Sequence, residues 1–276
     1  MTDASEARQA DRTLKAKHRA MWALGDYPSV ASHVVSPLGP LLVKECGIQI
    51  GDRVLDIAAG SGNAAIPAAL AGADVVASDL TPELLEVGRH LAAVQGAQLE
   101  WREADAEDLP FADGEFDVVM SCIGIMFAPH HRAAADEMLR VCRAGGTVGL
   151  VSWTPEGFVG RLFATMKPFA PPPPPGVQPP PLWGSEEYVH ELLGDAVTDV
   201  VARRGTVRVT LFKNPSDFRE FFKACYGPTI AVYRAVGDDP EKVAALDAAL
   251  DALAAEHTTD GVMEWEYLLL TAHRRG

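Results

Sequence analysis

Short apolar runs and helix-like patterns alternate through the middle of the chain. Strands are expected near 52–57, 74–79, 98–103, 116–121 and 146–152, and helices near 63–71, 82–95 and 130–142. Thr81, Pro82 and Glu83 support one helix start, because they offer a capping hydroxyl, a proline at the first helical position and an early acid. Strands separated by helices form a parallel sheet. The pattern therefore predicts an α/β core over residues 48–153 with a doubly wound, mostly parallel sheet.

Different patterns flank this core on both sides. Residues 1–10 are polar and are expected to lack regular structure, whereas helices are expected near 11–24 and 29–46, so residues 1–47 form an N-terminal helical segment. Beyond the core, eight of the eleven residues 171–181 are proline, which favours an extended polyproline conformation. The rest of the segment 154–276 predicts a helix near 185–193, a strand near 199–212, helices near 215–225, 228–236 and 240–256, and a last strand near 263–273.

Composition places the chain among folded, globular proteins. Its 276 residues suit one large domain with additions, and hydrophobic residues make up 48% of them. The formal net charge of −14 disfavours nucleic acid as a partner, because nucleic-acid binding needs a basic surface. The four cysteines (Cys46, Cys122, Cys142 and Cys225) lack metal-type spacing and are typical of reduced thiols in a cytoplasmic protein. No apolar run approaches the length of a membrane span, so no membrane partner is expected.

The most informative local signal is an acid that precedes a small-residue loop at the end of the first core strand. Asp56 lies in the apolar run 54–57, and Gly60 and Gly62 follow it, where they let the backbone turn sharply and approach a ligand closely. A strand, a Gly-rich turn and a helix in this order form the nucleotide-binding end of a doubly wound sheet. Two further acids, Asp79 and Asp105, stand at the ends of the next two expected strands.

With these motifs the chain resembles the class I S-adenosylmethionine-dependent methyltransferases, particularly the branch with small-molecule acceptors. The segments 116–121 and 139–146 also resemble this family, and five motifs in the family's order make the resemblance specific. Ala58 replaces the family's first loop glycine, a departure that a methyl side chain permits. The resemblance implies a Rossmann-like methyltransferase fold with a seven-stranded, mostly parallel sheet, and S-adenosylmethionine as the cofactor.

The resemblance also implies a role for each motif residue. Asp56 and the loop 58–62 are expected to receive the methionine end of the cofactor. Asp79 is expected to accept from both ribose hydroxyls, and Asp105 from the adenine amino group, with the Ala106 amide facing the ring. The alternative is that these acids only cap neighbouring helices. The other cofactor-binding candidates lie beside the motifs or in the N-terminal segment: Asn63, Leu80, Cys122, Trp22 and Tyr27.

Two other classes of protein remain as alternatives. The spacing of Gly60, Gly62 and Ala65 also fits the fingerprint of an NAD(P)-dependent oxidoreductase. Against it, Asp56 would repel a pyrophosphate but would form a charge-assisted hydrogen bond with a methionine ammonium, and dinucleotide binding does not require Asp105. The second alternative is a non-catalytic cofactor-binding scaffold whose proline run binds an aromatic-lined groove of a partner. The complete trio of acids favours methyl transfer over both.

Residues outside these motifs indicate how an acceptor is handled. His131, at a helix start after the fourth strand, is the candidate general base, or else a first-turn residue that faces water. Trp183, Phe222 and Tyr226 are candidate acceptor contacts, or else the apolar packing face of their helices. They indicate a small, apolar, aromatic or quinone-like acceptor, methylated at oxygen, nitrogen or carbon. No metal is expected, since the histidines lack ligand spacing.

The end of the chain departs from the resembled family, whose last two strands form an antiparallel hairpin at one sheet edge. Here about fifty residues of helix separate the corresponding strands, more than a turn requires. This insertion is expected to form a helical cap before the last strand. Together with the proline run, it is expected to lie over the carboxyl ends of the sheet strands, where ligands of an open parallel sheet bind. The oligomeric state stays open.

Overall fold

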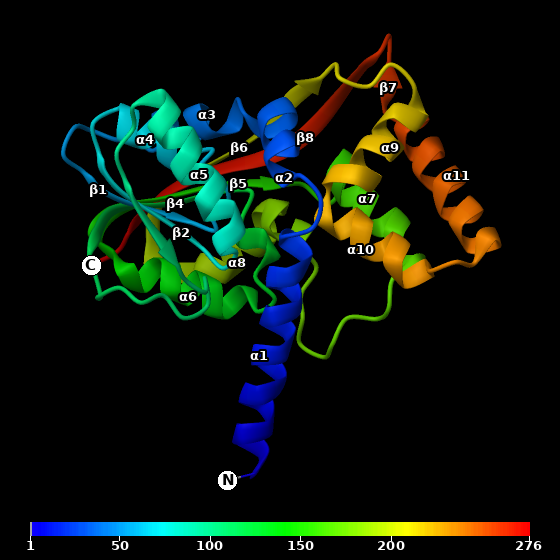
Figure 1. The fold of residues 1–276 in the computed structure, drawn as a ribbon. Helices are drawn as coiled ribbons and strands as arrows, with labels where there is room; N and C mark the ends of the chain where they lie inside the picture. Colours follow the sequence, from blue (N-terminus) through cyan, green and yellow to red (C-terminus); the bar gives the residue numbers. More distant parts are fainter. Residues whose placement is uncertain (1) are drawn as a thin grey trace.

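A computed structural model gives the fold of residues 2–276 (Figure 1). Most of the expected strands and helices are present, in the expected order. The elements are α1 (Thr2–Trp22), α2 (Tyr27–Val30), η1 (Ala31–Val35), α3 (Leu38–Glu45), β1 (Arg53–Ile57), α4 (Ala65–Leu70), β2 (Asp74–Asp79), α5 (Pro82–Gln95), β3 (Glu100–Glu103), β4 (Phe116–Cys122), η2 (Ile125–Phe127), α6 (His131–Val141), β5 (Cys142–Trp153), α7 (Phe158–Met166), η3 (Lys167–Phe169), η4 (Pro180–Gly184), α8 (Glu186–Leu193), η5 (Gly194–Ala196), β6 (Val197–Val209), α9 (Pro215–Cys225), α10 (Gly227–Val236), α11 (Pro240–Glu256), β7 (Thr258–Thr259) and β8 (Val262–Arg274).

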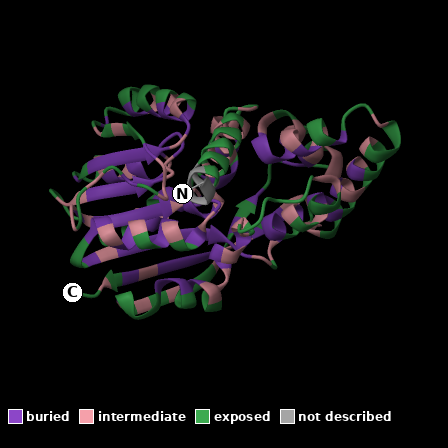
Figure 2. Ribbon diagram, turned by 90° about the horizontal axis from the view of Figure 1, so that it is seen from below, coloured by how far each residue is buried: buried purple, intermediate pink, exposed green. Residues whose placement is uncertain are grey.

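The sheet follows the order β3-β2-β1-β4-β5-β8-β6, and the two-residue strand β7 pairs with β8. Strands β1 to β5 pair in parallel, whereas β8 is antiparallel to both β5 and β6. In the centre, Leu55 of β1 lies opposite Val76 of β2 and Val119 of β4, and all three are fully buried. Helices cover both faces of the sheet, and Figure 2 shows its strands as largely buried. The predicted seven-stranded, doubly wound, mostly parallel sheet is confirmed.

Local signals explain where the helices begin and end. α5 begins at Pro82 after the N-cap Thr81, and it ends at Gly96 in a left-handed conformation that glycine adopts without strain. The Thr81 hydroxyl makes no capping bond, contrary to the expectation from sequence. α9 begins with a capping box, in which the Asn214 and Asp217 side chains each accept from the other's backbone amide.

The structure differs from the expected elements in four places, one of which is the helix α7, for which no element was expected. α1 includes residues 2–10, for which no regular structure was expected, because the helical pattern continues toward the terminus. The helix expected near 29–46 is divided into α2, η1 and α3, with a turn before Leu38. Pro180 and Pro181 begin the 3₁₀-helix η4 rather than an extended segment, since the fixed φ of proline also suits a first helical turn.

The helical cap lies where it was expected, beyond the carboxyl ends of the parallel strands. It consists of α9 to α11, inserted between β6 and β8, together with α7 (Figure 1). Phe218 and Phe222 of α9 pack against Trp265 of β8, with ring centroids 6.3 and 5.7 Å away. α10 in turn contacts α1, so the cap and the N-terminal segment meet on one side of the sheet. Across residues 2–276, no helix is both long and apolar enough to cross a membrane.

Candidate active site

A cavity of about 80 Å³ lies at the carboxyl ends of the parallel strands, between the sheet and the N-terminal segment. Each of the first four strands contributes through its last residue or through residues that follow it. The residues that line the cavity are Ala58 and Gly60 after β1; Asp79 at the end of β2, with Leu80, Thr81 and Leu84 after it; Ala104, Asp105 and Ala106 after β3; and Gly124, Ile125, Phe127 and Ala128 after β4. The N-terminal segment closes the cavity with His18, Trp22 and Tyr27.

The loop after β1 has an unusual backbone conformation. Ala58 has a φ of 54° and Ile123, after the neighbouring strand β4, has a φ of 69°, which is a left-handed conformation that L side chains rarely adopt. A Cβ atom at Gly124 would stand 2.0 Å from the Ala58 carbonyl oxygen, so only glycine permits this approach. The structure thus brings the backbones after β1 and β4 into direct contact beside the cavity.

Asp79 is held by the backbone on both sides. Its two carboxylate oxygens accept from the amides of Gly60 and Thr81, each at 2.8 Å. Burial raises the pKa of Asp79 despite these hydrogen bonds. Since each carboxylate oxygen can accept more than one hydrogen bond, the side chain can still bind hydroxyl donors in the cavity.

Asp56 is buried and lies away from the cavity wall. Its carboxylate oxygens make no hydrogen bond of good geometry among the described residues. Burial raises the pKa of Asp56 to about 8, the nearby Ala65 backbone amide counteracts this in part, and the Asp79 charge adds to it. A buried carboxylate without a partner is unfavourable, so a cationic group bound beside the loop would stabilise its charged form. The direct contact with a ligand that the sequence predicted for Asp56 is not evident from its position.

Three of the predicted cofactor contacts do not line the cavity but connect the loop to its neighbours: Asn63, Gly62 and Cys122. The Asn63 amide donates to the Val35 carbonyl at 2.9 Å and lies 3.6 Å from the Cys122 sulfur. Gly62 has a φ of 88°, and a Cβ atom there would stand 2.7 Å from the Trp101 ring. These three cofactor candidates therefore join the loop to η1, β4 and β3.

Asp105 forms part of an ion-pair network that fastens α1 to the site. The Lys15 ammonium lies 2.7 Å from Asp105, 2.9 Å from Glu107 and 3.0 Å from Asp11. Burial disfavours the charged ammonium, but its hydrogen bonds to these carboxylates outweigh that effect and raise the pKa of Lys15. Ligand atoms of Asp11, Glu107 and His130 also come within 4.8 Å of one another. Because Lys15 already neutralises two of them, we assign no metal to this cluster.

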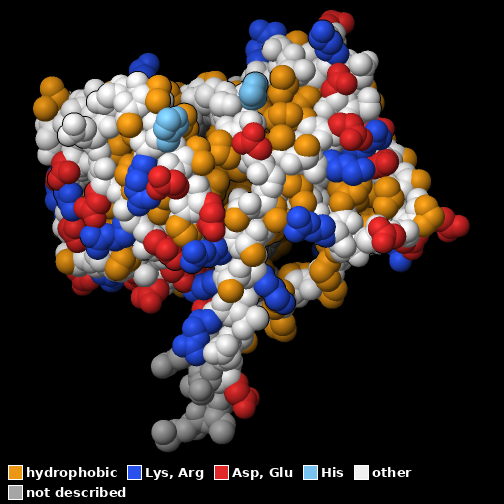
Figure 3. Space-filling view, viewed as in Figure 1, with side chains coloured by type: hydrophobic (Ala, Val, Ile, Leu, Met, Phe, Trp, Pro, Cys, Tyr) orange, Lys and Arg blue, Asp and Glu red, His pale blue; other side chains and the backbone are white. Residues whose placement is uncertain are grey.

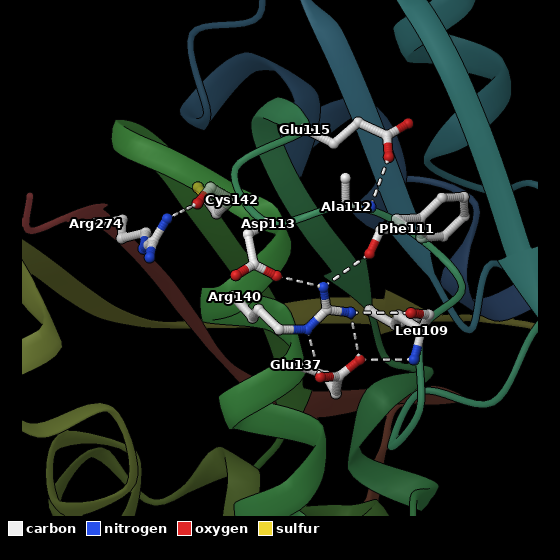
Figure 4. A network of polar contacts seen from close by, with 9 residues as sticks. All are labelled: Leu109, Phe111, Ala112, Asp113, Glu115, Glu137, Arg140, Cys142 and Arg274. Atoms are coloured by element: carbon white, nitrogen blue, oxygen red, sulfur yellow. Dashed lines mark hydrogen bonds and ion pairs between the residues drawn. The ribbon is translucent and has the colours of Figure 1, made fainter.

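The segment that follows Asp105 is fixed to α6 by a compact polar network (Figure 4). The Arg140 guanidinium donates to the carbonyls of Leu109 and Phe111 at 2.9 and 2.7 Å, and to Glu137 at 2.7 Å. Glu137 accepts from the Leu109 amide at 2.7 Å. These bonds hold a connection without regular structure, so Asp105 and Ala106 keep their positions at the cavity.

Aromatic side chains separate the cavity from a second, smaller chamber of about 20 Å³ under the cap. The ring of Trp22 lies 4.6 Å from that of Phe127 and 5.4 Å from that of Tyr27. Tyr27 and Phe127 line both spaces. The predicted acceptor contacts Phe222 and Tyr226 line this inner chamber, although both are also part of the apolar core. Its other lining residues are Val30, Val34, Val35, Ile123, Trp153, Val159 and Trp265.

His131 and Trp183 are not at the cavity, contrary to their predicted roles. His131 begins α6 as expected but is fully buried, with its Nδ1 atom 3.0 Å from the Tyr188 hydroxyl. Its ring lies 5.6 Å from that of Trp183. Burial lowers the pKa of His131 to about 4. The segment that carries η4 and α8 folds over this part of α6, so both side chains serve as core.

Sequence reasoning missed two residues of the cavity wall that carried a usable signal. His18 stands four positions before Trp22 in α1, a spacing that puts both side chains on one helix face. Phe127 lies just past the carboxyl end of β4, where ligands of such a sheet bind. Burial lowers the pKa of His18, so its imidazole is neutral at pH 7.

The strand order and the position of the cavity define a doubly wound α/β protein with a candidate ligand site at the carboxyl ends of its strands. A family model described as "Methyltransferase domain" matches residues 54–146. The uncharacterized protein Rv1403c of Mycobacterium tuberculosis is 54% identical over 267 residues, which is 97% of this chain and 96% of that protein. The demethylmenaquinone methyltransferase of Clavibacter sepedonicus is 43% identical over 98 residues, 36% of this chain and 40% of that protein.

Solved structures agree on the fold. The YcgJ protein of Bacillus subtilis has a TM-score of 0.59 at 19% identity, over 86% of this chain and 97% of that chain. The phosphoethanolamine N-methyltransferase 2 of Haemonchus contortus, in complex with phosphomonomethylethanolamine and S-adenosylhomocysteine, has a TM-score of 0.56 at 16% identity, over 87% of this chain and 53% of that chain. The chain belongs to the class I S-adenosylmethionine-dependent methyltransferases, and its function is that of a methyltransferase.

Proposed function

We propose that this protein transfers a methyl group from S-adenosylmethionine to a small, apolar acceptor with an aromatic or quinone-like ring. The observation that supports it most is the cavity in which Asp79 and Asp105 stand at neighbouring strand ends beside the loop of Ala58 and Gly60. When bound, S-adenosylmethionine supplies a methyl group that its sulfonium already activates. The protein therefore has to align the two partners and exclude water.

The proposed placement of the cofactor follows from the charges around the cavity. Asp79 would bind the ribose hydroxyls, because its carboxylate is already oriented by two backbone amides. Asp105 and Ala106 would hold the adenine, and the methionine ammonium beside the loop would stabilise the charged form of Asp56, whose pKa burial raises. The partly buried aromatic pair Trp22 and Tyr27 would cover the bound cofactor.

The proposed acceptor site is the inner chamber, which adjoins the cofactor cavity at Tyr27 and Phe127 and whose volume of about 20 Å³ has to widen to admit a ring. Its side chains are apolar or aromatic, which suits a flat ring and disfavours a charged acceptor. Burial raises the pKa values of Tyr27 and Tyr226, so both phenols stay neutral and can donate a hydrogen bond to an acceptor oxygen. The similarity of the core to a demethylmenaquinone methyltransferase is consistent with a quinone-like ring.

Isothermal titration with S-adenosylmethionine and with NAD tests the cofactor. We expect Asp79→Ala to weaken S-adenosylmethionine by about ten- to a hundredfold, because it removes charge-assisted hydrogen bonds. Asp79→Asn should lose less, since its amide oxygen still accepts. Asp238→Ala is the matched control, because Asp238 is exposed in the turn after α10. Equal affinity of the parent and Asp79→Ala would overturn the ribose assignment, and a preference for NAD would overturn the cofactor.

A panel of aromatic and quinone-like metabolites, assayed with a labelled methyl donor, tests the acceptor. Transfer of the label to at least one ring compound is the expected result. A protein that binds S-adenosylmethionine normally but methylates only charged, non-aromatic acceptors would contradict the proposed acceptor class. The position of the label in the product identifies the methylated atom.

A further inference from the structure

A large cavity of about 1080 Å³, here called the outer cavity, lies between α1, the end of α7, η3, the segment 170–177 and α10. Figure 3 shows an opening beside α1 with hydrophobic side chains around much of its rim. Its volume reaches the upper end of the range of about 300–1,000 Å³ that is usual for small-molecule sites. Neither the cofactor cavity nor the inner chamber explains a space of this size.

The wall of the outer cavity suits a hydrocarbon chain. Pro171 to Pro175 form one side, and proline has no backbone N–H with which to bind a polar ligand. The remaining apolar side chains come from α1, α7 and α10, with Ala170 and Val177 on the proline segment: Leu14, Met21, Phe163, Met166, Pro228, Ala231, Val232 and Ala235. Such a surface in contact with water is unfavourable, and an apolar ligand would cover it.

The charged residues of the outer cavity favour an anion. Lys17 and Lys167 both line it and are exposed, and neither forms an ion pair with another described side chain. The acid Asp11 also lines it, but its carboxylate is paired with Lys15 at 3.0 Å and lies 3.3 Å from His130. The outer cavity therefore presents two free cations on a protein whose net charge is −14.

α1 is a wall shared by the outer cavity and the cofactor cavity. His18 lines both spaces, and Trp22 of the same helix lines the cofactor cavity. Phe163 of the outer cavity lies 5.9 Å, between ring centroids, from Phe127 of the cofactor cavity. Lys15 pairs with Asp105 on the cofactor side. A ligand that fixes α1 from the outer side would therefore also hold the cover of the cofactor site in place.

We propose that the outer cavity is a binding site for an acidic amphiphile, with the hydrocarbon chain along the proline wall and the anionic group at Lys17 and Lys167. We further infer that this ligand strengthens cofactor binding, because both ligands require α1 in the same position. By linkage, the cofactor strengthens binding of the amphiphile by the same factor. The site goes beyond methyl transfer, and its occupation does not depend on which acceptor is methylated.

Calorimetric titration with dodecanoate below its critical micelle concentration tests the site, with dodecylamine as the probe of opposite charge. We expect dodecanoate to bind and dodecylamine to bind at least about tenfold more weakly. The double variant Lys17→Gln with Lys167→Gln should bind dodecanoate about tenfold more weakly than the parent does. Equal binding of the two probes, or an unchanged double variant, would refute the anionic site. No binding of dodecanoate would refute the whole proposal.

A cavity-filling variant locates the binding. Ala235 is exposed on α10 and lines the outer cavity, so Ala235→Trp fills space without disturbing the core and should weaken dodecanoate at least about tenfold. Ala245→Trp, on the exposed face of α11, is the matched control and should bind dodecanoate as the parent does. Equal losses in both variants, or none in Ala235→Trp, would place the ligand elsewhere.

The coupling is tested separately, by titrating S-adenosylmethionine with and without saturating dodecanoate. We expect its dissociation constant to fall by at least about fivefold. An unchanged constant would refute the shared-wall inference. If S-adenosylmethionine does not bind under either condition, the proposed methyl transfer fails and the coupling fails with it, whereas the dodecanoate site is decided by its own titrations.

Discussion

Replacing His131 with asparagine distinguishes a structural imidazole from a general base. His131 is fully buried against Trp183, and its Nδ1 atom bonds with the Tyr188 hydroxyl. Asparagine keeps a polar group near the Nδ1 position but cannot take up a proton. We therefore expect His131→Asn to change the pH dependence of stability and to leave methyl transfer at neutral pH nearly unchanged.

The magnitude follows from the pKa of this side chain. Burial lowers it from 6.5 to about 4, so between these pH values the unfolded chain binds a proton that the folded chain does not. The stability contributed by the neutral imidazole is fully present above pH 6.5 and is lost as the pH falls toward 4. A difference of about 2.5 pKa units corresponds to about 3 kcal/mol in all, of which about 2 kcal/mol is lost between pH 7.5 and pH 5.

Urea unfolding of the parent and of His131→Asn at pH 7.5 and pH 5 measures the stability contributed by the neutral imidazole. The variant loses packing against Trp183 and should be less stable than the parent at pH 7.5. The difference between their free energies of unfolding should narrow by about 2 kcal/mol at pH 5, because only the parent loses the contribution of the neutral imidazole. Asp56 titrates with the opposite sign, because its raised pKa makes stability fall as the pH rises toward 8, but it is common to both proteins and cancels. A gap that is independent of pH would refute the burial argument. A folded variant whose kcat falls by about a hundredfold would restore His131 as a base.

Three further substitutions test the site. Gly124→Ala places a Cβ atom 2.0 Å from the Ala58 carbonyl oxygen, so urea unfolding should show a free energy of unfolding lower by about 1–3 kcal/mol. Calorimetric titration should show weaker binding of S-adenosylmethionine, and unchanged binding would contradict the contact between the two loops. Lys15→Gln removes the cation between Asp105 and Glu107, so stopped-flow measurements should show faster release of S-adenosylmethionine, and an unchanged rate would mean that the network does not hold α1. Phe222→Leu should raise the acceptor KM and leave cofactor affinity unchanged, whereas weaker cofactor binding alone would remove Phe222 from the acceptor site.

The parts of the site that depend on strand ends were predictable from sequence. Asp79 ends the apolar strand β2 and Asp105 follows the short strand β3, and the geometry of a parallel sheet brings such ends together. The positions of Ala58 and Gly60 at the cavity were predictable for the same reason, because both residues follow the end of β1. The signal is local in the chain, while the proximity comes from the regular spacing of parallel strands, which needs no knowledge of side-chain packing.

The errors concern residues whose surroundings come from distant parts of the chain. His131 follows the end of β4 in the sequence, a position typical of a site residue. In the structure η4 and α8 cover it, and no local sequence pattern predicts this covering. Asp56 belongs to the motif but does not line the cavity, so its predicted contact with the cofactor stays a prediction. His18 was missed because α1 carries no motif and reaches the site only through tertiary contacts.

Two kinds of unfavourable feature, a positive φ at residues with a side chain and a buried carboxyl group without a partner, occur beside the proposed cofactor site. Four non-glycine residues in the described chain have a positive φ, and two of them, Asp199 and Asp260, are of a type that tolerates it. The other two, Ala58 and Ile123, follow β1 and β4 at the cavity, each at a cost of about 1–3 kcal/mol. The partnerless carboxylate of Asp56 lies on β1, directly before this loop. A ligand that binds only the folded state offsets such costs by an amount that grows with the logarithm of its concentration relative to its dissociation constant. The backbone conformation of the loop at the proposed cofactor site is thus one that the chain alone disfavours, and a bound ligand would stabilise it.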